Sequence, residues 1–68
     1  MGGKKELIIY NLSGQMIRTW DLSAHEAGRQ RIVWDGRNAQ GRAVASGVYM
    51  AVLRLGDWQQ QLKLTLLQ

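Results

Sequence analysis

The chain has 68 residues and no cysteine, and its nine Lys and Arg against five Asp and Glu give a formal net charge of +4. A chain of this length forms one domain at most, and it buries only roughly 60% of the surface that its unfolded form exposes. Small domains usually gain stability from disulfides, a metal ion or oligomerisation. Disulfides are excluded by the composition, and His25 is the only histidine. We therefore expect the chain to associate with a partner chain.

The sequence also argues against several classes of protein. No apolar run approaches the roughly 20 residues of a membrane helix, so membrane insertion is not expected. The cationic residues form no clustered stripe of the kind that binds nucleic acid, so a nucleic-acid partner is not expected either. The scattered cations include Arg29, Arg31, Arg37, Arg42, Arg54 and Lys63.

Residues 1–4 are interpreted as a tail or an expression scar, and residues 5–68 as a single β-sandwich module.

Two runs near the start of the chain predict a β-hairpin. Lys5–Tyr10 carries apolar or β-branched side chains on both alternating faces, which is typical of a strand that is covered on both sides. Asn11–Gln15 combines Asn, Ser and Gly, which favour a tight loop. Met16–Trp20 is the expected returning strand.

The segment Asp21–Gly28 is interpreted as a surface loop. Ser23 and Glu26 have the spacing of a capping box, which would favour a helix. Gly28 would end that helix after about one turn, and helices this short are marginal in water. His25 lies in this loop, and we expect its imidazole to be exposed and uninvolved.

Arg29–Trp34 alternates in the manner of a strand, with Trp34 directed into the core. The long loop that follows, from Trp34 to Tyr49, is dense in turn residues. We expect Asp35 and Asn38 to accept hydrogen bonds from backbone amides of this loop, and its glycines to permit the bends. The predicted structural-loop residues are Trp34, Asp35, Gly36, Asn38, Gly41 and Gly47.

Two further strands are predicted at the end of the chain. Val48–Leu55 is apolar on both faces and is expected to be central in the sheet, whereas Trp58–Leu66 alternates and is expected to have one wet face. About five strands at short spacing predict an all-β antiparallel sandwich or a small barrel. Because the chain has no proline, its first and last strands are expected to be open edges.

No arrangement of residues predicts catalysis. The serines, the one histidine and the five carboxylates do not form a recognisable nucleophile or acid–base pair. The run from Asp35 to Gly41 has some features of a calcium loop, but Arg37 and Arg42 argue against a cation there. We therefore predict no catalytic residue, no metal ligand and no cofactor.

The aromatic residues have two interpretations. Trp20, Trp34 and Trp58 fall at strand ends in phase with apolar neighbours, which favours core packing. Large amphipathic rings are also favoured at interfaces and on sugar-stacking platforms. The candidate interface residues are Tyr10, Trp20, Trp58, Leu64 and Leu66.

Five pieces of the sequence carry a family resemblance, and they occur in the order Ile9–Gln15, Ala27–Arg29, Val33–Arg37, Gly41–Tyr49 and Lys63–Leu67. Together they resemble the C-terminal immunoglobulin-like module of two related groups. One is the type IX secretion sorting domain of exported bacterial proteins, and the other is the immunoglobulin-like domain of the flagellar hook-capping protein. The resemblance implies an immunoglobulin-like β-sandwich in which Trp34 lies in the core and Asp35 organises the loop. It also implies that one or two strands of the family are missing before Glu6, so the chain is expected to form a homo-oligomer or to receive a strand from a partner chain.

The preferred hypothesis from this resemblance is a non-catalytic C-terminal sorting module that secretion machinery recognises, on a protein that is secreted or displayed at the cell surface. One alternative is a structural or self-assembling immunoglobulin-like module of the hook-capping type, or an engineered fragment of one. A second alternative is a carbohydrate-binding module that uses Trp20, Trp58 or Tyr10.

Overall fold

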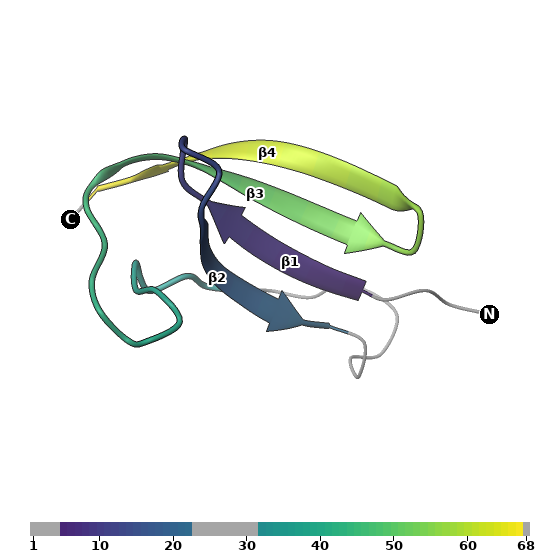
Figure 1. The fold of residues 1–68 in the computed structure, drawn as a ribbon, viewed down its shortest axis with the longest axis horizontal. Helices are drawn as coiled ribbons and strands as arrows, with labels where there is room; N and C mark the ends of the chain where they lie inside the picture. Colours follow the sequence, from purple (N-terminus) through teal and green to yellow (C-terminus); the bar gives the residue numbers. More distant parts are fainter. Residues whose placement is uncertain (1–4, 23–31, 68) are drawn as a thin grey trace.

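The computed structural model describes residues 5–22 and 32–67, and the strands among them form one antiparallel four-stranded sheet (Figure 1). Its strands are β1 (Lys5–Tyr10), β2 (Met16–Asp21), β3 (Gly47–Leu55) and β4 (Trp58–Leu66), in the spatial order β2-β1-β3-β4. The all-β prediction is therefore confirmed. The central position expected for Val48–Leu55 is also confirmed, because β3 lies between β1 and β4. The part of the chain that the structure describes contains no helix long and apolar enough to cross a membrane.

The order of the strands corrects one prediction. The first strand was expected to be an open edge, but β1 pairs with β2 on one side and with β3 on the other. The edges of the sheet are β2 and β4. Since Ile8 and Ile9 point to opposite faces and are only 3% and 2% exposed, the interior position of β1 agrees with its two apolar faces.

The turn between β1 and β2 forms because Asn11 bonds to its own loop. Its side-chain Oδ1 accepts hydrogen bonds from the backbone N–H groups of Ser13 (3.0 Å) and Gln15 (2.9 Å). The N–H of Gly14 donates to the Asn11 carbonyl oxygen at 3.0 Å, and Gly14 has a φ of 85°, which glycine adopts without steric cost. The predicted hairpin and its turn chemistry are confirmed.

The second hairpin joins β3 to β4 through Gly56 and Asp57, and it keeps a continuous register from Leu55 opposite Trp58 to Gly47 opposite Leu66. The first hairpin is less regular. Its register shifts between Ile9 and Tyr10, so that Ile17 has no direct partner on β1. This bulge places both Ile17 and the next residue, Arg18, on the same side of the sheet.

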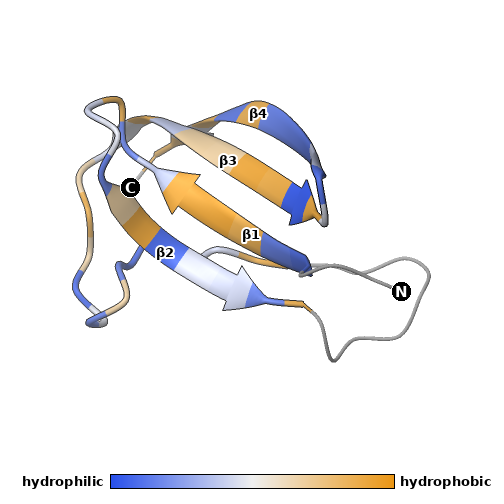
Figure 2. Ribbon diagram, turned by 45° about the vertical axis from the view of Figure 1, so that its right-hand side comes forward, coloured by the Kyte–Doolittle hydropathy of each residue, from blue (hydrophilic) through white to orange (hydrophobic). Residues whose placement is uncertain are grey.

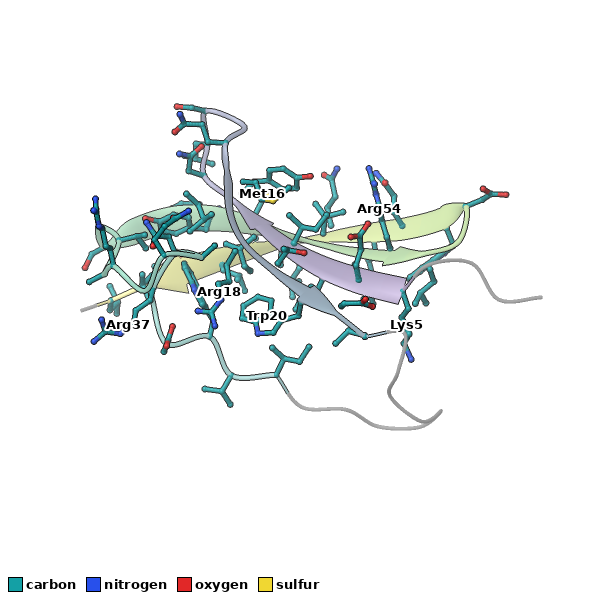
Figure 3. The ribbon with its side chains drawn as sticks, turned by 60° about the horizontal axis from the view of Figure 1, so that its bottom comes forward. Lys5, Met16, Arg18, Trp20, Arg37 and Arg54 are labelled. Atoms are coloured by element: carbon teal, nitrogen blue, oxygen red, sulfur yellow. The ribbon has the colours of Figure 1, made fainter. Side chains whose placement is uncertain are left out.

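The two faces of the sheet differ in what covers them. The side that we call the loop face lies against residues 32–46, which run below the sheet in Figure 3. The other side, the open face, carries Met16 and Arg54, which point away from that segment (Figure 3). Figure 2 shows that the most hydrophobic stretches belong to β1 and β3, the two central strands. The loop face includes Leu7, Ile9, Trp20, Tyr49, Ala51, Leu53, Leu62, Leu64 and Leu66.

The core lies on the loop face. Ile9, Tyr49 and Ala51 form its buried cluster, and half-buried side chains from the strands and from the segment 32–46 pack around it. The core therefore lies between two layers. One layer is the sheet, and the other is the segment of residues 32–46, which we call the ordered segment. The residues packed around the cluster are Leu7, Ile17, Trp20, Trp34, Val44, Leu64 and Leu66.

The strand predicted at Arg29–Trp34 is not formed by its described part. Residues 32–34 are outside the sheet, although Ile32 and Trp34 are half-buried and Val33 is exposed, as the alternating pattern indicated. The reason is that alternation reports which side chains face the core, whereas a strand also needs a neighbour with which to exchange hydrogen bonds. Residues 29–31 and the predicted loop at Ser23–Gly28, with His25, lie outside the described residues.

Truncation of Ile9 tests the position of the core. Ile9→Ala should lower the free energy of unfolding by about 2–5 kcal/mol, because it removes most of a side chain that is only 2% exposed and leaves a cavity. Leu67→Ala, at an 85% exposed position, should change the stability by less than about 0.5 kcal/mol. Urea unfolding followed by tryptophan fluorescence measures both. Equal effects of the two substitutions would contradict the assignment, and Ile9→Val provides a milder variant if Ile9→Ala does not fold.

Candidate functional site

Most of the predicted structural-loop residues lie in the segment of residues 32–46. Aromatic contacts hold this segment to the sheet. The rings of Trp34 and Tyr49 meet edge to face, with centroids 5.2 Å apart and planes at 77°. The hydroxyl of Tyr49 donates a hydrogen bond of 2.6 Å to the carbonyl oxygen of Ala45. A tyrosine near the start of a strand that bonds to backbone a few residues upstream is the arrangement of a tyrosine corner in immunoglobulin-like sandwiches.

Asp35 joins this segment to β2. Its Oδ1 accepts a hydrogen bond from the backbone N–H of Arg37 at 3.0 Å and one from the guanidinium of Arg18 at 3.1 Å. The carbonyl oxygen of Arg37 in turn accepts from Trp34 Nε1 at 2.9 Å and from Arg18 Nη1 at 3.3 Å. The Asp35 carboxylate and the Arg37 carbonyl oxygen therefore both accept hydrogen bonds from groups of this protein.

Asn38 builds a turn with the same hydrogen bonds as the turn at Asn11. Its Oδ1 accepts from the backbone N–H groups of Gln40 and Arg42, both at 3.0 Å. The N–H of Gly41 donates to the Asn38 carbonyl oxygen at 3.0 Å, and the φ of Gly41 is 83°, close to the 85° of Gly14. In both turns an asparagine bonds two and four residues ahead, and a glycine stands three residues ahead.

Further backbone hydrogen bonds join the two halves of the segment to each other and its tip to β2. Arg37 and Ala43 form an isolated β-bridge, and Val44 N–H donates to the carbonyl oxygen of Gly36 at 2.9 Å. Ala39 N–H donates to the carbonyl oxygen of Ile17, which ties the tip of the segment to β2. Gly36 and Gly47 also have positive φ, 75° and 152°. The predicted structural-loop residues therefore all lie in, or at the end of, one bonded unit.

Arg18 was not among the residues predicted from the sequence. Its guanidinium lies 5.1 Å from the centre of the Trp20 ring and contacts Asp35 and Arg37 (Figure 3). Arg18 stands opposite Ile9, so its side chain is on the loop face, and its partner Asp35 is 17 residues away. No local spacing rule connects the two residues, so only the strand pairing brings them together.

The structure separates the candidate interface residues. Tyr10 lies on the open face, whereas the side chains of Trp20 and Trp58 are on the loop face but on the two opposite edge strands. Leu64 and Leu66 are half-buried and pack against the core, while Trp58 is 50% exposed. The aromatic rings named for a sugar platform therefore do not form one continuous surface.

Tyr10 borders a hollow on the open face, with a volume of about 400 Å³. Side chains from both hairpins line it, and Arg54 also lies 3.6 Å from Glu6. Amide and guanidinium groups in this hollow can donate and accept hydrogen bonds. Its lining residues are Tyr10, Asn11, Leu12, Gly14, Met50, Val52, Arg54, Gln59 and Gln61.

Within residues 5–22 and 32–67, no three histidine or carboxylate side chains come together as a set of metal ligands. The carboxylates of this region include Glu6 on β1, Asp35 beside Arg18, and Asp57 in the turn after β3. Glu6 and Asp35 each lie beside an arginine.

Comparison with known proteins identifies the kind of domain. The family model of the FlgD Ig-like domain matches residues 3–55, well over half of the chain. The match includes β1, β2, β3 and the ordered segment, whereas β4 lies outside it. No curated protein and no solved structure matched the chain. With the antiparallel sheet, this match confirms the prediction of an all-β, immunoglobulin-like fold.

Replacement of Asn38 tests the shared turn. Asn38→Ala should lower the free energy of unfolding by about 1 kcal/mol, because it removes the acceptor of two backbone N–H groups. Asn38→Asp keeps an oxygen at that position and should lose clearly less. Asn11→Ala and Asn11→Asp should show the same ranking, since the same two bonds are made there. If alanine and aspartate were equally harmful at both positions, the side-chain oxygen would not be the stabilising group.

Asp35 gives a second test of the segment. Asp35→Ala should lower the free energy of unfolding by about 1–3 kcal/mol, because it removes the acceptor of Arg37 N–H and the ion pair with Arg18. We expect the lower part of this range, because the Asp35 side chain is 55% exposed and water screens the pair. Asp35→Asn keeps the acceptor without the charge, so its difference from the unmodified chain measures the ion pair, and the difference between the two variants measures the hydrogen bond from Arg37 N–H. Thermal unfolding with unchanged stability in both variants would contradict the structural role.

Proposed function

Because the chain belongs to the FlgD Ig-like domain family, we propose that it is a non-catalytic structural module that acts by contact with other protein subunits, as in a flagellar hook-capping protein. The observation that carries this proposal is the match of the family model over residues 3–55. Immunoglobulin-like sandwiches supply rigid surfaces to many assemblies, so the fold alone would not select this role.

The contacts of the ordered segment support a structural role. The oxygens of Asp35 and Asn38 accept bonds from the backbone of the same segment, and Arg18 fixes its start to β2. Side chains used in this way hold the backbone in one conformation. The exposed surface of the sheet is therefore the part of the module that we propose for contact with a partner.

The more specific hypothesis of a type IX sorting signal remains a prediction, and the matched family is the hook-capping one. The two functions differ in what recognises the domain and in where the protein goes. A sorting signal would be read by secretion machinery and would direct an attached cargo out of the cell, whereas an assembly module contributes to a structure built from many subunits.

A domain exchange tests the proposal. In a motile bacterium, the immunoglobulin-like domain of the hook-capping protein is replaced by this chain, and hook length and swarming are scored against a strain in which the domain is deleted. We expect the exchange to restore at least part of hook assembly, and a control with Ile9→Ala to restore less because the core is weakened. No restoration by a chimera that is folded and present at normal levels would overturn the proposal.

Two further measurements address the alternatives. Fusion of the chain to the C-terminus of a reporter in a bacterium with type IX secretion should leave the reporter in the cell, and its export would favour the sorting hypothesis. Titration with soluble polysaccharides should leave the tryptophan fluorescence unchanged. A saturable change that Trp58→Ala abolishes would favour the carbohydrate-binding alternative, since Trp58 is half exposed.

A further inference from the structure

The outer edge of β4 is the feature that the proposed function does not use. Among the described residues β4 pairs with β3 alone, along all nine of its residues. It has no proline and no bulge in its register, and Lys63 is its only charged residue. Proteins usually protect an exposed edge strand with charges, proline or a bulge, because its free N–H and C=O groups can pair with another strand. The opposite edge differs, because β2 has an irregular register and receives the bond from Ala39.

The loop face beside this edge is apolar. Leu55, Trp58 and Leu62 are 38%, 50% and 61% exposed, respectively, and Leu55 and Trp58 stand opposite each other across the β3–β4 hairpin. Next to them lies a depression of about 190 Å³ with a mostly apolar lining that includes Leu53 and Leu62. The opposite side of β4 carries Gln59, Gln61, Lys63 and Thr65.

We propose that β4 pairs with β4 of a second copy of this chain, antiparallel and centred on Leu62. This inference rests on the open edge and does not depend on the hook-capping role. The two sheets would join into one continuous sheet with four strands from each copy. Because a two-fold axis perpendicular to the sheet keeps the faces on the same side, the loop faces of both copies would form one surface.

The side chains of β4 fit this register. With Leu62 opposite itself, Trp58 lies opposite Leu66 of the second copy, and Gln60 lies opposite Leu64. On the open face, Gln59 lies opposite Thr65 and Lys63 lies opposite Gln61, so no two like charges are directly opposed. Aromatic–aliphatic pairs across strands stabilise a sheet, and like charges directly opposite destabilise it.

Neighbouring registers are worse. A shift by one residue in one strand would place loop-face residues opposite open-face residues, which the pleat of the sheet does not allow. A register centred on Lys63 would place two lysines opposite each other. A register centred on Gln61 would leave Thr65 and Leu66 without partners. Only the register centred on Leu62 pairs all nine residues of β4.

The size of the interface fits a second copy. Nine paired residues extend over roughly 30 Å at 3.4 Å per residue, and the molecule is 38 Å long. An interface of standard size takes about 800 Å² from each partner, which is about 15% of the 5320 Å² surface of this chain (800/5320). Backbone pairing along one edge covers less than this, so the apolar side chains beside the edge have to contribute, and we expect a dimer that dissociates on dilution.

Single cysteines test the register, because the chain has none of its own. Leu62→Cys should form an intermolecular disulfide on mild oxidation, since directly opposite Cβ atoms are about 4.5–5.5 Å apart. Gln60→Cys alone should not, because the two copies of residue 60 would be offset by four positions, or about 13 Å. A mixture of Gln60→Cys and Leu64→Cys should give the mixed disulfide. Non-reducing gels resolve all three cases, and cross-linking of Gln60→Cys alone would overturn the register.

Charge at the centre of the interface tests the pairing without a covalent bond. Leu62→Lys should weaken self-association at least tenfold, because it places two like charges opposite each other. Leu12→Lys is the matched control, with the same change of side chain and net charge at a 71% exposed position in the β1–β2 turn, and it should associate like the unmodified chain. Leu62→Glu should also be weakened, and its mixture with Leu62→Lys should associate again.

Sedimentation equilibrium over a wide range of concentrations measures these constants, with circular dichroism to show that each variant is folded. A compact monomer at every concentration would overturn the proposal. An oligomer that Leu62→Lys and Leu12→Lys affect equally would also overturn it, because association would then use another surface. Neither result would affect the domain exchange described above, so the failure of one proposal leaves the other testable.

Discussion

The constraint on which this structure depends is that the apolar loop face of the sheet must be covered. The described residues provide a single sheet, and the segment 32–46 lies across its loop face where Ile9, Tyr49 and Ala51 are buried. A segment without regular structure has polar backbone groups that must be bonded before it can lie on an apolar surface. Asp35 and Asn38 accept several of these N–H groups, and the edge-to-face contact of Trp34 with Tyr49 attaches the segment to the core.

This division of roles changes where function is to be sought. Turn-rich loops on rigid scaffolds frequently carry binding sites, and the run from Trp34 to Tyr49 is rich in such residues. In this protein the side-chain oxygens of Asp35 and Asn38, which were expected to organise that run, bond to its own backbone. Exposed surfaces of the sheet include the hollow beside Tyr10 and the edge strand β4.

The sequence predicted local features well and distant ones poorly. The strands β1 and β4 have the predicted bounds, and β2 and β3 are each one residue longer than predicted. These bounds could be predicted because alternation and turn chemistry act within a few residues. The strand order and the Arg18–Asp35 contact were not predicted, since they depend on pairing between residues far apart in the chain. At residues 32–34 the pattern indicated correctly which side chains face inward, but it could not show that none of the described strands pairs with these residues.

The order of the strands has a consequence for the kinetics of folding. The β1–β2 and β3–β4 hairpins each join neighbouring parts of the chain, whereas the β1–β3 pairing at the centre connects Tyr10 to Met50 and Lys5 to Leu55. Closing so long a loop has a large entropic cost, and topologies rich in distant contacts fold slowly. The docking of the two hairpins should therefore limit the rate. Local bonds that order the connecting segment in advance, such as those of Asn38, would lower that entropic barrier.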